Sequence, residues 1–342
     1  MKYSLIIPVY NRPDEVDELL ASLEAQTLKD FEVVVVEDGS TISCQNVVNE
    51  HASRLALRYY QKENSGPGQS RNYGAERSQG EYLIVLDSDC VLPPGYLQAV
   101  DNELQLQPCD AFGGPDRAHD SFTSVQKAIN YSMTSFFTTG GIRGGKKKLD
   151  KFYPRSFNMG IKAELYQRLN GFSAMRFGED IDFSIRIFKS GASCRLFPEA
   201  WVWHKRRTDM KKFFKQVHNS GIARINLMKR HPGSMKLVHL LPAVFTIGIS
   251  FLFVLLLIGL VLFNECGFLL ASASLIPMLL FSLLIFIDSL FKNKSIMVAC
   301  LSIIASFIQL TGYGTGFIRA WWLRCVCGRN EELQAFKDNF YQ

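Results

Sequence analysis

The sequence has 342 residues, 47% of them apolar and 20% charged, with a formal net charge of +6. This composition excludes a disordered chain, and its 25 glycines and 12 prolines exclude collagen-like and low-complexity chains. The mean hydropathy of +0.04 is high for a soluble globular protein. Either the whole chain is uniformly apolar, or a polar domain is joined to a membrane segment, and the order of the residues decides between the two.

The N-terminal segment predicts a buried strand. Residues 3–9 (YSLIIPV) form a short apolar run that ends in a turn. The run is too short for the apolar region of a cleavable signal peptide, so we expect roughly the first 230 residues to stay in the cytoplasm. The eight cysteines are scattered and form no metal-like quartet, which is the pattern of reduced thiols.

The next segments alternate between helical and strand patterns. After the turn at Asn11–Asp14, apolar residues recur at helical spacing up to Leu23. Strands are predicted at residues 31–36 and 82–86. This alternation predicts a mostly parallel, Rossmann-like α/β sheet with helices on both faces, in which ligands bind at the carboxyl ends of the strands. The sequence shows neither a dinucleotide-binding glycine motif nor a P-loop.

Acidic residues follow two of these strands. Asp87-Ser88-Asp89, at a strand end, is expected to place two carboxylates on one side of an extended backbone, because alternate side chains point the same way. Two such oxygen ligands suit Mg²⁺ or Mn²⁺ bound to a diphosphate, although a polar exit from a strand gives the same pattern. Asp38 closes the preceding strand, where a carboxylate accepts hydrogen bonds from a base or ribose, or forms an Asx-turn.

Two further segments carry charged residues next to glycine. Gly66–Ala75 is predicted to be a glycine-rich loop that runs into a helix, on which Arg71 reaches a phosphate or braces an aspartate. Glu179 and Asp180 begin a helical pattern, where acids interact favourably with the helix dipole or act as a general base. The loop Thr138–Arg155 has four glycines and six basic residues; it is a solvated surface loop or a lid over phosphates, with Lys146–Lys148 at its centre.

Apolar segments dominate the C-terminal third. Residues 237–263 and 267–291 are long and apolar enough to cross a bilayer, and residues 296–318 are predicted to cross or to lie at the interface. Ten Lys/Arg and one acid between Trp201 and His239 give a net charge of +9 directly before the first segment. This basic stretch fits the positive-inside rule and attraction to anionic lipids. It also explains the positive charge better than nucleic-acid binding does.

The charge pattern is inconsistent with three full crossings. The turn at Asn264–Cys266 has no Lys/Arg and is expected outside, whereas Lys292 and Lys294 are expected inside. A third crossing would then place the arginines from Arg319 onward outside, against the rule. Either the third segment does not cross fully or the rule fails in this chain.

Seven short motifs occur in order within residues 3–230. They are Pro8-Val9-Tyr10-Asn11, Glu37-Asp38-Gly39-Ser40, Arg71-Asn72-x-Gly74, Asp87-Ser88-Asp89, Asn158-Met159-Gly160, Gly171-Phe172 and Gly178-Glu179-Asp180. In this order and at this spacing the chain resembles family 2 glycosyltransferases of the GT-A fold. The resemblance implies an inverting, metal-dependent enzyme with a nucleotide-sugar donor and Mg²⁺ or Mn²⁺ as cofactor.

The resemblance also implies roles for individual residues. The nucleotide-sugar-binding residues are Pro8, Val9, Tyr10, Asp38, Arg71, Asp87, Ser88 and Asp89. Within this set, Asp38 corresponds to the base or ribose contact and Asp87 to the ribose or diphosphate contact. Asp89 corresponds to the metal ligand, and His204 to a histidine that adds a metal contact in this fold. Asp180 corresponds to the catalytic base, with Glu179 beside it.

The resemblance favours transfer of a single sugar. Processive synthases of this family carry a Gln-x-x-Arg-Trp motif after the base, and the corresponding region, residues 215–224, lacks it. We therefore expect a membrane-anchored hexosyltransferase of cell-envelope polysaccharide biosynthesis, acting on a lipid-linked or growing glycan acceptor at the cytoplasmic face of the inner membrane. Two alternatives stay open: transfer to a polyprenyl phosphate, and a non-catalytic membrane adaptor that keeps the nucleotide pocket.

These patterns predict three regions. Residues 1–230 are expected to form the GT-A catalytic domain, and residues 231–323 an all-α membrane region with two or three transmembrane helices. Residues 324–342 are expected to form a polar tail.

Overall fold

The computed structural model describes residues 1–117, 122–140, 152–262 and 264–333. The chain divides into two compact units. Among the described residues, unit 1 contains 1–117 and 152–205, and unit 2 contains 122–140 and 206–333. The loop hypothesis for Lys146–Lys148 falls outside the described residues.

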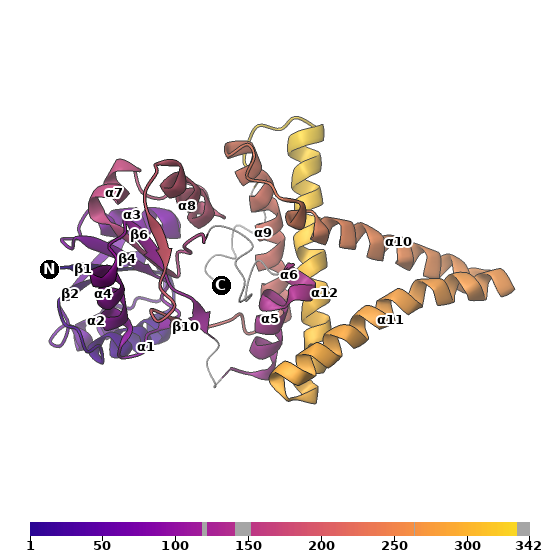
Figure 1. Ribbon diagram of the computed structural model, residues 1–342, viewed down its shortest axis with the longest axis horizontal. Coiled ribbons are helices and arrows are strands. Elements are labelled where there is room, and N and C mark those ends of the chain that lie inside the picture. Colours follow the sequence, from indigo (N-terminus) through magenta and orange to yellow (C-terminus); the bar gives the residue numbers. More distant parts are fainter. Residues whose placement is uncertain (118–121, 141–151, 263, 334–342) are drawn as a thin grey trace. The chain divides into compact units, whose positions relative to one another are not determined.

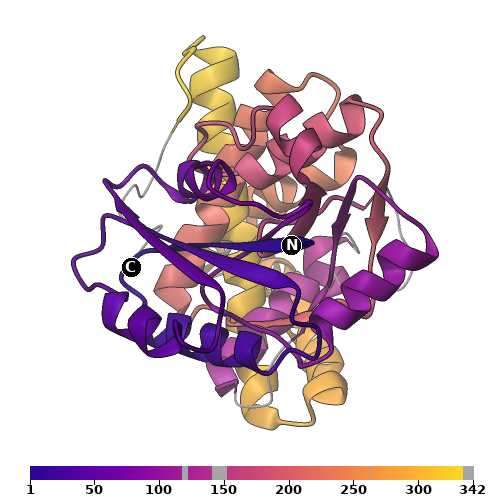
Figure 2. The same ribbon diagram turned by 90° about the vertical axis from the view of Figure 1, so that its left-hand side faces the viewer.

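Unit 1 is built on a seven-stranded sheet (Figures 1 and 2). Its strands are β1 (Tyr3–Val9), β2 (Phe31–Asp38), β3 (Leu57–Lys62), β4 (Tyr82–Leu86), β6 (Ala111–Gly113), β8 (Asn158–Lys162) and β9 (Cys194–Leu196). They lie in the order β3-β2-β1-β4-β8-β6-β9, and β8 is antiparallel to both of its neighbours. The expected mostly parallel sheet is confirmed, while the reversed strand β8 was not predicted.

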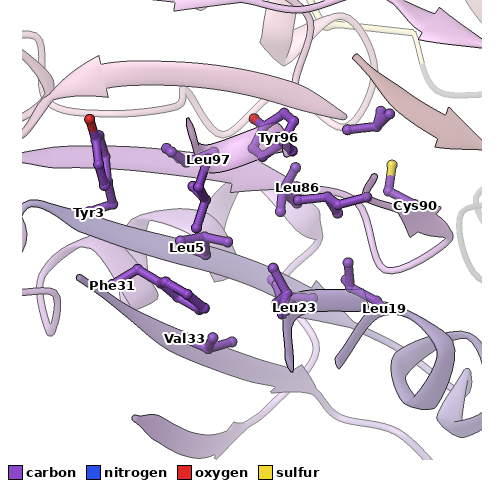
Figure 3. Close-up of a cluster of buried hydrophobic side chains, with 14 of the residues drawn as sticks. Tyr3, Leu5, Leu19, Leu23, Phe31, Val33, Leu86, Cys90, Tyr96 and Leu97 are labelled. Atoms are coloured by element: carbon purple, nitrogen blue, oxygen red, sulfur yellow. The ribbon is translucent and has the colours of Figure 1, made fainter. Parts of the chain in front are cut away.

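Helices cover both faces of this sheet, as expected. One face packs against α1 (Pro13–Glu24), α2 (Gln45–His51) and α4 (Tyr96–Leu106), and the other against α3 (Pro67–Ala75), α7 (Ala163–Arg168) and α8 (Glu179–Lys189). Alternate residues of β1 supply the two cores: Leu5 and Ile7 point to the first face and Ile6 to the second. Figure 3 shows the first core, where Leu5 lies near Leu23 of α1 and Leu97 of α4.

A second, three-stranded sheet contributes to unit 1. Strand β10 (Val202–His204) lies between β5 (Cys90–Val91) and β7 (Asp116–Arg117). It is antiparallel to β5, with His204 opposite Cys90. This pairing brings His204 next to the acidic segment that follows β4.

Unit 2 is helical. It contains α5 (Ser124–Thr134), α6 (Phe136–Thr139), α9 (Met210–Arg230), α10 (Leu241–Val261), α11 (Glu265–Asn293) and α12 (Ile296–Trp321). A short 3₁₀ helix at Leu237–His239 precedes α10, and a short π-helix at Trp322–Val326 follows α12. Three stretches, Leu237–Val261, Glu265–Asn293 and Ile296–Val326, are long and apolar enough to cross a membrane by length and composition. The three expected apolar segments are therefore helices. The basic stretch before them forms α9, which carries a buried apolar stripe.

Candidate active site

The acidic residues singled out in the sequence gather at one edge of the large sheet. Strand β1 lies between β2 and β4 and is parallel to both. The carboxyl ends of β2 and β4 therefore lie on the same edge, and Asp38 and Asp87 are the residues at those ends. This edge is where open α/β sheets bind their ligands.

Asp38 holds the loop that follows β3. Its carboxylate is 1% exposed and accepts hydrogen bonds from the backbone N–H groups of Ser65 and Gly66, both at 2.9 Å. The ammonium of Lys62 also donates to it. Gly66 adopts a φ of 92°, a left-handed conformation that favours glycine, and α3 begins at the next residue, Pro67. The segment expected to be a glycine-rich loop is therefore mostly helix, with the loop before it fixed by Asp38.

Arg71 joins the strand edge to helix α8. Its guanidinium, on α3, donates to Asp87 at 2.7 Å and to Glu179 at 3.0 Å. The side chain is 3% exposed, and the carboxylates of Asp87, Glu179 and Asp180 raise its pKa against the effect of burial. A buried arginine that bridges two carboxylates fixes both. Of the two roles considered for Arg71, the structure shows that it braces an aspartate.

Asp89 lies between an arginine and a histidine. One of its carboxylate oxygens is 2.8 Å from Arg12 Nη1, and the other is 3.2 Å from His204 Nε2. The imidazole stacks on Phe157 at 4.9 Å between ring centroids. The pairing of His204 with Cys90 and its stacking on Phe157 thus hold His204 Nε2 facing the Asp89 carboxylate oxygen.

The backbone at Asp87–Asp89 is a turn and not extended. The N–H of Cys90 donates to the carbonyl of Asp87 at 3.1 Å, which closes the turn. The expectation that both carboxylates lie on one side of an extended backbone is therefore wrong. Each carboxylate instead has its own partners: Arg71 for Asp87, and Arg12 with His204 for Asp89.

The donors around Asp89 fit a divalent cation. A carboxylate oxygen of Asp89 and a ring nitrogen of His204 are ligand atoms that Mg²⁺ or Mn²⁺ accepts, and they lie with Cys90 Sγ within 4.8 Å of one another. Burial, together with the charges of Asp89 and Asp87, raises the pKa of the Cys90 thiol well above its ordinary value. Since only the thiolate binds metals well, the carboxylate and the imidazole are the fitting ligands.

Glu179 and Asp180 begin α8 after Gly178, which has a φ of 81°. Glu179 is buried, and the loss of hydration and the neighbouring Asp180 raise its pKa to about 7, against the opposing effect of Arg71. Asp180 is 8% exposed, and Arg155 Nε lies 2.7 Å from one of its carboxylate oxygens. The two adjacent carboxyls therefore have different basic partners.

The remaining predicted residues lie at the same edge with different exposures. Pro8 and Tyr10 are half-buried, whereas the Val9 side chain is 1% exposed and packs in the core of the first sheet face. Only the backbone of Val9 is left to face a ligand. Ser88 is buried in the turn between the two aspartates.

Three basic residues of the site were not predicted. They are Arg12, Lys62 and Arg155, which contact Asp89, Asp38 and Asp180 respectively. Arg12 lies in the turn after the first strand, and Arg155 ends the basic loop noted in the sequence. A search for basic residues at strand ends would have found Arg12 and Lys62.

Comparisons with known proteins agree with this geometry. Residues 4–169 match the model of the family described as Glycosyl transferase family 2. This N-terminal part of the chain is therefore similar to family 2 glycosyl transferases. Its mixed α/β sheet is that of the GT-A fold. A mannosyltransferase of Pyrobaculum calidifontis, PcManGT, shares the fold with a TM-score of 0.56 at 17% identity, over 94% of this chain and 87% of that one.

Two curated relatives are similar over parts of this domain. An uncharacterized glycosyltransferase of Haemophilus influenzae is 30% identical over 194 residues, 54% of this chain and 62% of the relative. The poly(ribitol-phosphate) beta-N-acetylglucosaminyltransferase TarS of Staphylococcus aureus is 40% identical over 93 residues, 26% of this chain and 16% of that one. Against two uncharacterized glycosyltransferases of Rickettsia, the match spans 23% and 14% of the relative's own length.

Proposed function

We propose that the protein is a metal-dependent, inverting glycosyltransferase. It moves one hexose-type sugar from a nucleotide-sugar donor to a lipid-linked or growing glycan acceptor at the cytoplasmic face of the inner membrane. The observation that carries the proposal is the bridge of Arg71 between Asp87 and Glu179. It brings the strand edge that fits a nucleotide diphosphate to the helix that carries the proposed base, Asp180.

Donor binding involves the strand edge. Pro8, Tyr10 and the backbone of Val9 are proposed to line the nucleoside pocket, with Asp38 contacting the base or ribose or holding the loop that does. Asp87 and Ser88 are proposed to bind the ribose or diphosphate.

The metal is proposed to bind between Asp89 and His204. When bound, a divalent cation neutralises the charge that grows on the departing nucleoside diphosphate. Arg12 then has a second role, because its guanidinium faces the same carboxylate and supplies positive charge at the diphosphate end of the site.

The transfer step requires a single base. Asp180 takes the proton of an acceptor hydroxyl, whose oxygen forms a bond to the anomeric carbon. The bond from that carbon to the diphosphate oxygen breaks, and its electron pair leaves with the nucleoside diphosphate. Because attack and departure are on opposite sides, the configuration inverts and no covalent sugar–enzyme intermediate forms. Arg155 orients the Asp180 carboxylate for this task.

The relatives support this assignment. TarS is a beta-N-acetylglucosaminyltransferase that acts on poly(ribitol-phosphate), and a Streptomyces hygroscopicus relative, 40% identical over 101 residues, is a validoxylamine A glucosyltransferase. The PcManGT structure contains GDP-Man and Mn²⁺. Hexosyl donors and a divalent cation therefore occur among proteins similar to this chain.

The proposal is tested by screening UDP-, GDP- and dTDP-sugars for turnover with membranes that contain the full chain. We expect turnover with one donor class, its loss on chelation and its recovery with Mn²⁺ or Mg²⁺. Asp89→Asn is expected to abolish turnover, whereas the exposed control Asp30→Asn leaves it unchanged. If the protein binds a nucleotide but turns over no donor with either metal, the adaptor alternative holds instead.

The acceptor class is tested with Asp180→Asn. A hydroxyl acceptor needs its proton removed, so the variant should lose nearly all transfer. A polyprenyl phosphate is already anionic, so a mild loss would instead support the polyprenyl-phosphate alternative. Donor affinity of the variant, measured separately, distinguishes a lost base from a lost donor site.

A further inference from the structure

Helix α12 contacts α10 and α11 at the ends of these helices that lie away from the loop connecting them, which we call their bases. It contacts α10 near that helix's start, where Thr246 donates to the carbonyl of Leu310 and Gly314 approaches the carbonyl of Pro242. It contacts α11 near that helix's end, where the Ser289 and Ser302 hydroxyls are 2.7 Å apart. Figure 1 shows α10 and α11 meeting at their far ends and diverging toward α12. A third helix that crossed a bilayer beside them would run along them instead.

The far ends of α10 and α11 form the apolar tip of a hairpin. Gly259 packs against the backbone of Gly267 and Ala271, which brings the two helices together at the tip. Large apolar side chains point outward along both helices, with Phe251 60% exposed and Phe268 74% exposed. Each helix is about 30 Å long or more at 1.5 Å per residue, which matches the hydrocarbon core of a bilayer.

Helix α9 runs alongside α12 in the same direction. Gly312 of α12 contacts Phe214 and Val217 of α9, and Arg324, after α12, donates to Asn226 at 2.8 Å. Between these contacts the backbones approach so closely that a Cβ at Gly316 would lie 2.0 Å from a carbonyl oxygen of α9. The two helices therefore share one depth along their common length.

The alignment of α9 with α12 sets the position of the α9 lysines along the length of α12. Gly312 is at the middle of the apolar stretch Ile296–Val326, and Lys215 lies between its two α9 contact residues. If α12 crossed the bilayer, Lys215 would lie at the bilayer centre, with Lys211 and Lys212 about one turn away. Helix α9 carries six basic residues and no acid. A cluster of lysines at that depth is strongly unfavourable.

We propose that only α10 and α11 cross the bilayer, and that α5, α9 and α12 form an interfacial layer whose basic side chains meet anionic lipid headgroups. The lysines of α9 then lie at the depth where such headgroups attract them. The charge conflict in the sequence is resolved, because Lys292, Arg319 and Arg324 all lie on one side, and Glu265 at the hairpin turn lies on the other. The chain after α12 returns to the side from which α10 starts.

Contacts at the base of α11 support this depth. Tyr131 of α5 donates to Asp288 at 2.6 Å, and Lys292 pairs with the same carboxylate at 2.8 Å. On the adjacent short helix α6, Phe136 is 67% exposed, and Phe137 lines an apolar hollow of about 440 Å³ with the side of α11. Polar and aromatic groups meeting at one level are typical of the membrane–water interface.

The cysteines of the chain provide the test. Cys266 lies at the hairpin turn and Cys327 follows α12, and both are exposed. Full-length variants keep one of them, with the other exposed cysteines, Cys300 and Cys325 included, replaced by serine. A third variant has all four replaced and carries Leu106→Cys at a position of unit 1 that is 82% exposed. Each is treated with a membrane-impermeant maleimide in spheroplasts and in inverted vesicles, and a variant without exposed cysteines gives the background.

We expect Cys327 and Leu106→Cys to be labelled in inverted vesicles only, and Cys266 in spheroplasts only. Labelling of Cys327 from the same side as Cys266 would mean that α12 crosses, and would overturn the proposal. Labelling of all three positions from one side would mean that α10 and α11 do not cross, and would overturn it as well. Because all four replaced cysteines are exposed, the serine replacements leave the packed interior unchanged.

Discussion

The pH dependence of stability should change when Glu179 is replaced by glutamine. The folded protein holds the Glu179 proton up to a pKa of about 7, against an ordinary value of 4.5 in the unfolded chain. Unfolding therefore releases a proton between these two values, and stability falls with rising pH in that window. Below pH 4.5 both states hold the proton, so Glu179 then has little effect on stability. Its destabilising effect grows as the pH rises from 4.5 to about 7 and stays constant above that.

The size of the effect follows from the pKa difference. One unit is worth about 1.4 kcal/mol, and glutamine does not titrate. The unfolding free energy of Glu179→Gln minus that of the wild type should therefore increase by about 2–3 kcal/mol from pH 5 to pH 8. For a unit of this size that corresponds to an increase of about 5–10 °C in the difference between the two thermal midpoints.

The assay is thermal unfolding of the detergent-solubilised full chain at both pH values. Glu164→Gln, on the exposed side of α7, is the matched control and should show the same midpoint difference from wild type at pH 5 and pH 8. A midpoint difference for Glu179→Gln that does not change with pH would show that the Glu179 carboxyl is not held protonated, and would refute the reasoning.

Three further predictions concern the metal, the donor loop and the helix packing. Asp89→Asn should raise the Mn²⁺ concentration for half-maximal nucleotide binding about tenfold or more, and an unchanged value would remove this carboxylate from the metal site. Lys62→Met should loosen the loop after β3 and raise the donor KM about tenfold with a smaller change in kcat; an effect on kcat alone would contradict this. Gly316→Ala forces a Cβ against the α9 backbone and should cost about 1–3 kcal/mol. Gly248→Ala, with nothing within 4 Å, should cost little by comparison; equal losses would argue against the close helix contact.

The sequence was sufficient for the central strands. Residues 3–9 and 82–86 were predicted at the bounds observed for β1 and β4, because uninterrupted apolar runs are typical of strands buried on both faces. The short strands were beyond such reasoning. β8 pairs with β4 and β6 in the reverse direction, and nothing in its five residues specifies that direction.

The residues of the site were easier to predict than their contacts. The types and positions of Asp38, Asp87, Asp89 and Asp180 stand out because acids at strand and helix ends are a local pattern. Their basic partners depend on tertiary register, so the approach of Arg155 to Asp180 has no local signal. The turn at Asp87–Asp89 was missed for a similar reason, since a hydrogen bond from Cys90 closes it.

The position of α12 has a consequence for biosynthesis. This helix contacts α5, α9, α10 and α11, and it is made after all four of them. Strands β1 to β4 can pair early during synthesis. The apolar side chains of α5 and α9 that pack against α12 stay without this partner until the ribosome has passed residue 321. Unit 2 therefore assembles only after α12 has been synthesised, later than the hairpin of α10 and α11. A ribosome stalled before α12 would leave these side chains exposed to chaperones and proteases.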